Sequence, residues 1–275
     1  MWALLILVVL CLGYFWNRVE GFDTKKHAIA VLTRGYDTPE KYKDLMARNR
    51  SLEAFHQANP EYDVLIFHEG NITETQQTYL QSKTKIPLTF KTVAFQQTVA
   101  NNPQCPNTPL SDSFSYGYKN MCRFWSITFL EQLKEYDYVI RLDEDCVLTK
   151  MNSDLIKEYA RDKIYFSSAH YQTEDAPEVV MGMKEFFDTR MEERIPPPVR
   201  MPYTNLMIVN IPFFRQHKKI QELLSQIDES QCIFSNRWGD LPIWGYLLSY
   251  WVPPEHVKED KTISYHHGSH ATQIN

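Results

Sequence analysis

Three acids in a row follow an apolar segment near the middle of the chain. The segment Tyr136–Leu142 reads YDYVIRL, and Asp143, Glu144 and Asp145 come directly after it. A strand that ends in Asp-x-Asp delivers two carboxylates to the edge of a sheet, where hard oxygen ligands suit Mg²⁺ or Mn²⁺ bridging a diphosphate. Acidic residues are also common in turns after strands, so the pattern alone leaves both a metal site and a solvated turn open.

The segments before this acidic turn alternate between strand-like and helix-like patterns. Apolar runs predict strands at 27–32, 62–69 and 88–95, and helical spacing predicts helices at 39–57, 73–81 and 117–135. Such alternation predicts an α/β fold with a mixed, mainly parallel sheet flanked by helices. Ligands of open α/β sheets lie beyond the carboxyl ends of the strands, which is where Asp143 and Asp145 are expected. The stretch 96–115 is long enough to be a functional loop.

Length and composition indicate one sizeable domain. The chain has 275 residues, 43% of them hydrophobic, and no linker, repeat or low-complexity tract divides it. A net charge of −5 and a pI near 6.0 offer no general attraction for nucleic acid, so nucleic-acid binding is disfavoured. Aromatic residues make up 13% of the chain, which fits stacking against sugars and fits an aromatic core equally well.

The N-terminal segment is apolar from Met1 to Trp16 and the chain becomes polar directly after it. At about 1.5 Å per residue it barely spans a bilayer, so it predicts a short signal anchor or a cleaved signal peptide. We assign residues 1–17 to a signal anchor, 18–26 to a short stem and 27–275 to a single folded domain. Basic residues follow the segment and none precedes it, so the positive-inside rule does not fix its orientation.

Two further features indicate the lumen of the secretory pathway. Asn49 and Asn71 begin acceptor sequons for N-glycosylation, in polar stretches expected at the surface. Beyond Cys11, an even set of cysteines is compatible with disulfides in an oxidising compartment, with four free core thiols as the alternative: Cys105, Cys122, Cys146 and Cys232. Together with the N-terminal anchor, these features predict that the rest of the chain lies in the lumen of the secretory pathway.

Four sequence blocks follow one another between residues 118 and 268. The blocks are YKNMCRFWS at 118–126, RLDEDCVL at 141–148, NIPFFRQHKKIQELLSQID at 210–228 with FSNRWGDLPI at 234–243, and ISYHHG at 263–268. They resemble motifs of the fungal-type Golgi α-1,2-mannosyltransferases of glycosyltransferase family 15, namely Y-R-H-M-C-R-F, R-x-E-P-D-V, F-F-R with R-W-G-D-x-P, and G-Y-x-H. The resemblance implies that residues 27–275 are a single GT-A catalytic domain, with GDP-mannose as donor, a glycan or glycoprotein acceptor, and transfer with retention of configuration. With the N-terminal anchor, it also implies a single-pass type II protein of the Golgi or ER membrane whose catalytic domain is luminal.

The resemblance also implies a Mn²⁺ site. Asp143 falls on the family's Glu, Asp145 on its Asp, and His267 on its metal-binding His. Glu144 stands where the family has a proline, so the motif here is a plain Asp-x-Asp. A set of carboxylates and imidazole suits Mn²⁺ better than Mg²⁺.

Four residues match family positions near the nucleotide. They are Tyr118, Arg123, Arg141 and Asp143. A phenol can donate a hydrogen bond to a phosphate and a guanidinium can pair with one. Helix packing is the alternative role for Tyr118 and Arg123.

Two residues are expected on the catalytic side, and a third departs from the family. Asp240, in R-W-G-D, is expected to orient an attacking hydroxyl or sugar, with a helix-cap role as the alternative. Asn205 is expected to contact the sugar. Met207 falls where the family has the acid that is its candidate nucleophile, and a thioether cannot replace a carboxylate. Front-face attack by the acceptor, a different acid such as Asp240, or loss of activity remain.

Because Met207 replaces the family's acid, other functions remain open. A membrane-anchored glycan-binding protein would retain the fold without catalysis, and a glycosyltransferase could use another nucleotide sugar. A metal-dependent phosphoesterase is the weakest alternative, because it would need ligands for a second metal that the sequence does not offer nearby.

Overall fold

The computed structural model describes residues 26–97, 102, 105, 108–173, 177, 180–190 and 199–268. The predicted anchor at 1–17, and all of the predicted stem except Lys26, lie outside the described residues. Within the described part of the chain, no helix combines the length and the apolar character needed to cross a bilayer.

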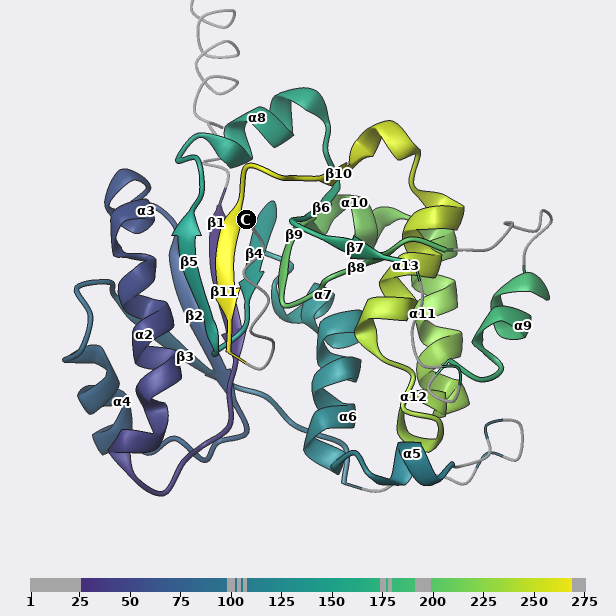
Figure 1. Cartoon of the computed structure of the whole chain (residues 1–275), viewed down its shortest axis with the longest axis horizontal. Coiled ribbons are helices and arrows are strands. Elements are labelled where there is room, and N and C mark those ends of the chain that lie inside the picture. Colours follow the sequence, from purple (N-terminus) through teal and green to yellow (C-terminus); the bar gives the residue numbers. More distant parts are fainter. Residues whose placement is uncertain are drawn as a thin grey trace, which may run out of the picture.

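A seven-stranded sheet forms the centre of the molecule (Figure 1). Its strand order is β10-β6-β9-β4-β1-β2-β3. Neighbouring strands run parallel except at β9, which is antiparallel to both β4 and β6. The strands are β1 (His27–Leu32), β2 (Asp63–His68), β3 (Leu88–Thr92), β4 (Tyr138–Leu142), β6 (Phe166–Ser168), β9 (Leu206–Asn210) and β10 (Val257–Glu259). The mixed, mainly parallel sheet expected from the sequence is confirmed.

Helices cover both faces of this sheet, as Figure 1 shows. One apolar cluster joins a sheet face to the helices α6 (Tyr116–Arg123), α7 (Phe129–Gln132), α10 (Ile211–Gln216), α11 (Lys218–Ser230), α12 (Cys232–Ser235) and α13 (Asp240–Trp251). The other face packs against η1 (Pro39–Tyr42), α2 (Lys43–Ser51), α3 (Glu53–Ala58), α4 (Glu74–Gln81) and α8 (Leu155–Asp162). Shorter elements are α5 (Pro109–Asp112), α9 (Met183–Asp188), η4 (Pro254–His256), β7 (Tyr171–Gln172) and β8 (Met201–Pro202).

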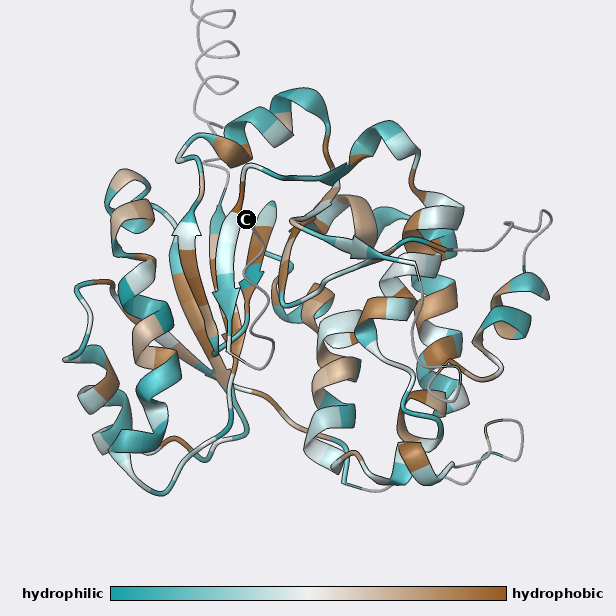
Figure 2. Ribbon diagram, viewed as in Figure 1, coloured by the Kyte–Doolittle hydropathy of each residue, from teal (hydrophilic) through white to brown (hydrophobic). Residues whose placement is uncertain are grey.

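The central strand β4 is buried along its whole length. Figure 2 shows apolar residues concentrated in the central strands, with polar residues more frequent on the outer helices. Because strand side chains alternate between faces, Ile140 and Leu142 enter one cluster and Val139 the other. Arg141 shares the face of Val139, so a guanidinium enters an apolar environment and needs charged partners there.

The predicted helix at 117–135 is interrupted. Between α6 and α7 lies a π-helical stretch, η2 (Phe124–Thr128), in which the Phe129 N–H bonds to the Phe124 carbonyl. Such wide turns are frequent at functional sites. The bulky side chains of Phe124 and Trp125 are fully buried in this stretch. The guanidinium carbon of Arg141 lies over the indole of Trp125, 4.7 Å from the centroid of the ring.

The four cysteines within the described residues divide into one pair and two free thiols. Cys105, in the predicted loop 96–115, forms a disulfide with Cys232 at the start of α12. Cys122 and Cys146 are free and buried. The sequence left the pairing open, because it depends on which loop the fold brings to α12.

One glycosylation expectation is wrong. Asn49 lies within α2, is 1% exposed, and accepts a hydrogen bond from the Arg48 guanidinium, so the folded chain cannot present it to a glycosylating enzyme. Asn71 is exposed between β2 and α4 and remains a candidate acceptor.

Asp260 anchors the segment that connects β10 to the C-terminal ribbon. The carboxylate is fully buried and accepts hydrogen bonds from Tyr159, Lys258 and Thr262. Burial alone would raise the pKa of Asp260, but these hydrogen bonds outweigh it and lower the pKa to about 2.

Asp260→Asn should therefore lower the free energy of unfolding at pH 7 by about 2 kcal/mol, since it removes charge-assisted hydrogen bonds. A depressed pKa stabilises the fold above the ordinary value of 3.8, and the stabilisation is lost as the pH falls toward 2. Urea unfolding should show the variant and wild type converging over that range. The exposed Asp162→Asn is the control and should change stability by less than about 0.5 kcal/mol; an equal loss in both variants would contradict the assignment.

Candidate active site

A two-stranded ribbon closes over the acidic turn at the end of β4. After Asp145, β5 (Cys146–Lys150) pairs antiparallel with β11 (Ser264–His267), with Cys146 opposite His267. The Gly268 N–H donates to the Asp145 carbonyl at 2.9 Å and extends the pairing to the turn itself. The ribbon therefore delivers His267 to the carboxyl end of β4.

Asp145 and His267 form the centre of the site. The His267 Nε2 lies 3.3 Å from an Asp145 carboxylate oxygen, and both side chains are partly exposed. This hydrogen bond raises the pKa of His267 above its usual value, against the opposing effect of burial. Metal binding requires a free lone pair on the imidazole nitrogen, so a cation held by both residues would take the place of this hydrogen bond. The structure brings these two predicted metal ligands together, and their metal binding stays a prediction.

Arg141 connects two other acids beside this pair. The guanidinium is 2% exposed and donates to both carboxylate oxygens of Asp143, at 2.8 and 3.0 Å, and to Asp240. Burial lowers the pKa of Arg141, but the two carboxylates outweigh it and raise the pKa overall. A buried ion triad of this kind fixes the end of β4 against the start of α13.

Asp143 is therefore held differently from Asp145. Both of its oxygens accept hydrogen bonds from Arg141, and its N–H donates to the Asn205 carbonyl at 2.9 Å. The oxygen, sulphur and nitrogen donors that lie within 4.8 Å of one another belong instead to Asp145, Cys146 and His267. The roles of Asp143 as metal ligand and nucleotide contact remain predictions. They require its carboxylate oxygens to bind the ligand while they still accept hydrogen bonds from Arg141.

Asp240 is the first residue of α13 and is 5% exposed. Its carboxylate accepts from Arg141, and no capping hydrogen bond is formed at the helix start. The structure thus shows Asp240 as an ion-pair partner of Arg141. Its predicted role in orienting the acceptor remains a prediction.

Asn205 and Met207 lie at the start of the neighbouring strand β9. The Asn205 side-chain oxygen accepts from the Tyr265 hydroxyl at 2.7 Å, which leaves its amide NH₂ as a donor for a ligand. Met207 is fully buried in the apolar cluster and lies opposite Arg141 in the strand pairing. Its thioether therefore packs behind the ion triad and is not exposed to a substrate.

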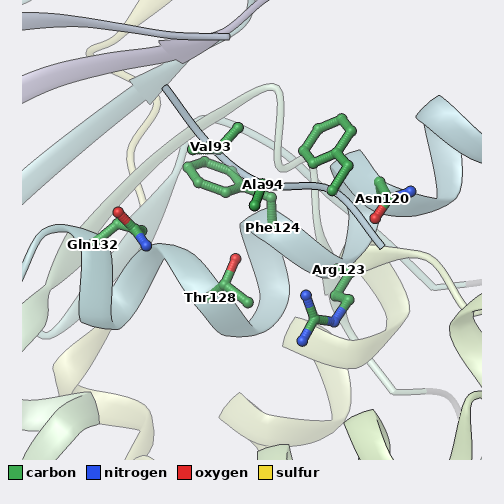
Figure 3. A pocket seen from close by; sticks show the side chains of 8 residues that line it. Val93, Ala94, Asn120, Arg123, Phe124, Thr128 and Gln132 are labelled. Carbon is green, nitrogen blue, oxygen red and sulfur yellow. The ribbon is translucent and has the colours of Figure 1, made fainter. Parts of the chain in front are cut away.

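Tyr118 joins α6 to the R-W-G-D loop. Its hydroxyl accepts from the Arg237 guanidinium at 2.6 Å, and burial raises the pKa of the phenol. Arg123, one turn further along α6, instead forms two hydrogen bonds of 2.6 Å with Asp228 of α11. Arg123 lines a pocket together with Asn120, Thr128 and Gln132 (Figure 3), and the volume of this pocket is about 120 Å³. No contact of Arg123 with the acidic turn is seen among the described residues, and its nucleotide role remains a prediction.

Sequence reasoning missed how Glu144 is used. Its carboxylate accepts from Thr33 and from the Tyr36 hydroxyl at 2.6 Å, so the acidic turn is tied to the loop after β1. Burial raises the pKa of Glu144. The sequence signal was that Glu144 stands where the family has a proline, but this did not indicate that Thr33 and Tyr36 would be its hydrogen-bond partners.

Comparison with known proteins gives one curated sequence match and several structural ones. No protein-family model matches the chain. A Candida albicans protein described as glycolipid 2-alpha-mannosyltransferase 1 is 24% identical over 173 residues, which are 56% of this chain and 40% of that protein. The chain thus spans less than half the length of this curated relative.

Two solved structures share the fold over most of the chain. Core-mannan synthase A from Aspergillus fumigatus, in a Mn/GDP form, aligns with a TM-score of 0.70 and 18% identity, covering 88% of this chain and 74% of that one. The mannosyltransferase Ktr4p from S. cerevisiae, in complex with GDP, aligns with a TM-score of 0.69 and 18% identity, covering 88% and 71%. The predicted GT-A fold is confirmed, and so is the resemblance of this chain, as a divergent relative, to the fungal mannosyltransferases.

Proposed function

We propose that the chain is a Mn²⁺-dependent glycosyltransferase that moves mannose from GDP-mannose to a hydroxyl of a glycan or glycoprotein. The observation that carries this proposal is the Asp145–His267 pair, 3.3 Å apart at the carboxyl end of a central strand. Its donor set suits Mn²⁺. A protein of the same fold is described in a Mn/GDP form, which supports the same pairing of metal and nucleotide here.

Each residue of the proposed site has a separate role. Asp145 and His267 hold the metal, which when bound neutralises charge on the departing diphosphate. Arg141 keeps the turn and the start of α13 in place through Asp143 and Asp240. These contacts preorganise the metal-binding carboxylate.

We propose retention of configuration without a covalent intermediate at Met207. The acceptor oxygen bonds to the anomeric carbon on the face from which the diphosphate oxygen leaves, and the hydroxyl proton passes to that oxygen. Met207 cannot serve as nucleophile, because it is a thioether and is fully buried. Asn205 can donate from its amide NH₂ to the sugar, since its oxygen is already occupied by Tyr265.

Met207→Leu should keep transfer within about threefold of wild type, because the side chain only packs the core and leucine has a similar volume. We expect its free energy of unfolding to change by less than about 1.5 kcal/mol. Steady-state kcat and KM for the donor check this. A loss of more than tenfold in kcat, with the fold intact, would show that the thioether takes part in the chemistry.

A donor screen of the full chain tests the function. Sugar release and transfer are followed from GDP-mannose, GDP-fucose and UDP-sugars, with Mn²⁺ and after chelation. Turnover of GDP-mannose only with Mn²⁺ is expected. Turnover of another donor alone would overturn the choice of sugar, and Mn²⁺-dependent nucleotide binding without turnover would favour the glycan-binding alternative, for which the loss of an acid at Met207 is the supporting observation.

We also propose that the protein is held in the Golgi or ER membrane with its catalytic domain in the lumen. The Cys105–Cys232 disulfide supports this location, because such bonds persist in oxidising compartments. Sensitivity of an Asn71-linked glycan to endoglycosidase in membrane fractions, and its loss in Asn71→Gln, is the expected result. An unglycosylated, reduced chain would contradict it.

A further inference from the structure

Cys146 adds a sulphur donor to the pair that holds the proposed metal. Donor atoms of Asp145, Cys146 and His267 all lie within 4.8 Å of one another. Cys146 and His267 are directly opposite in the β5–β11 pairing, and directly opposite residues project their side chains to the same face of a ribbon. The strand register itself therefore places the sulphur beside the imidazole.

The spacing is close to that of a coordinated ion. Ligands at about 2.0–2.3 Å from a tetrahedral ion lie roughly 3.3–3.7 Å from each other. The Asp145–His267 contact of 3.3 Å already meets this condition. The three atoms lie no more than 4.8 Å apart, so the Cys146 sulphur has only about 1 Å to move.

An ion can reach the sulphur from the side of the other two donors. Cys146 is fully buried, whereas the side chains of Asp145 and His267 are 28% and 17% exposed. Among the described residues, the sulphur donates one long hydrogen bond, 3.8 Å to the Asn205 carbonyl, and such a bond is weak.

The sulphur also changes which metal the site prefers. Carboxylate oxygens suit Mn²⁺, whereas thiolate favours softer ions such as Zn²⁺ and Cd²⁺. The fungal motif that this segment resembles has valine where this chain has Cys146, so the sulphur distinguishes this chain from that motif. With three protein ligands, one tetrahedral position would stay open for water or a phosphate oxygen.

We propose that Cys146 is a third metal ligand, and that Zn²⁺ or Cd²⁺ therefore binds the Asp145–His267 site more tightly than Mn²⁺ and displaces it. The metal–sulphur bond forms as the thiol proton leaves to solvent. This inference rests on the metal site of the proposed function, but it does not require transfer activity. It makes Zn²⁺ a competitor of Mn²⁺ for this site.

Titration of the full chain with Cd²⁺ tests the thiolate directly, through the ultraviolet sulphur-to-cadmium charge-transfer band. The band should appear in wild type and be lost in Cys146→Val. Zn²⁺ affinity should fall at least tenfold in that variant, while Mn²⁺ affinity changes less than about threefold, which also shows that the fold is kept. Cys122→Val is the matched control, because Cys122 is another free, buried cysteine and lies on α6, outside the donor cluster.

Two results would overturn the inference: a band that persists in Cys146→Val, or a wild-type chain that binds Mn²⁺ and shows no band with Cd²⁺. His267→Ala should weaken both metals, which separates loss of the whole site from loss of the sulphur alone. If the band behaves as expected and GDP-mannose is not turned over, the proposed function fails while this metal site stands.

Discussion

Replacing Asp145 by alanine should lower Mn²⁺-dependent transfer by about a thousandfold and leave the protein folded. The carboxylate lies 3.3 Å from His267, so its loss removes one of the two ligands that the proposed function assigns to the metal. Removing a single group that stabilises charge in the transition state costs about 10²–10³ in rate, and loss of metal affinity adds to it. Single-turnover transfer from GDP-mannose at saturating Mn²⁺ measures the effect.

The control for Asp145→Ala is Asp162→Ala, which removes an exposed acid at the end of α8. It should retain wild-type transfer. Both proteins should unfold at similar urea concentrations. Full activity in a folded Asp145→Ala protein would rule out this residue as the metal ligand and, with it, the proposed mechanism.

Replacing Arg141 by methionine should lower the free energy of unfolding by about 3–5 kcal/mol. Methionine can pack on Trp125 beneath the guanidinium position, but it leaves Asp143 and Asp240 in a buried site without their cation. Burial raises the pKa of Asp143 and Arg141 opposes this effect, so Asp143 should take up a proton more readily once the guanidinium is gone. The stability deficit of the variant should therefore shrink as the pH is lowered from 7 to 5.

A double-mutant cycle separates this effect from lost packing. In the Arg141→Met background, Asp240→Asn should recover part of the stability, because it removes one unpaired buried charge. The single Asp240→Asn variant should be destabilised. Urea unfolding of the four proteins gives the coupling energy. Additivity within about 0.5 kcal/mol would show that Arg141 and Asp240 do not act as a pair.

The sequence predicted those helices and strands that are determined by residues close together in the chain. The apolar runs of β1, β2 and β4 fall where strands form, since each is buried on both faces. The helix expected at 73–81 begins where Thr73 and Gln76 exchange reciprocal capping hydrogen bonds, which are encoded within four residues. By contrast, the break of α6 by a π-helical turn depends on how large side chains such as Trp125 pack into the core.

The sequence indicated which residues to compare at the candidate site, but only part of their contacts. The resemblance to the fungal family implies that Asp145 and His267 are metal ligands; the structure places them together, and their metal binding stays a prediction. The contact between Arg141 and Asp240 arises because β4 meets the N-terminus of α13, which no local pattern specifies. Asn49 shows the same limit, because its sequon is polar in sequence and buried by tertiary packing.

The disulfide has a consequence for how the residues of the candidate site come together during folding. Cys105 and Cys232 are 127 residues apart, so their bond closes a covalent ring that contains Arg141 and Asp145 but not His267. Closing a ring of this length removes conformational entropy from the unfolded chain worth about 5 kcal/mol. Of the two proposed metal ligands, Asp145 is therefore confined within the ring, and His267 must dock from the chain outside it. Synthesis in a reducing cytosol would leave this ring open, and the yield of active protein would depend on the oxidant present while the chain folds.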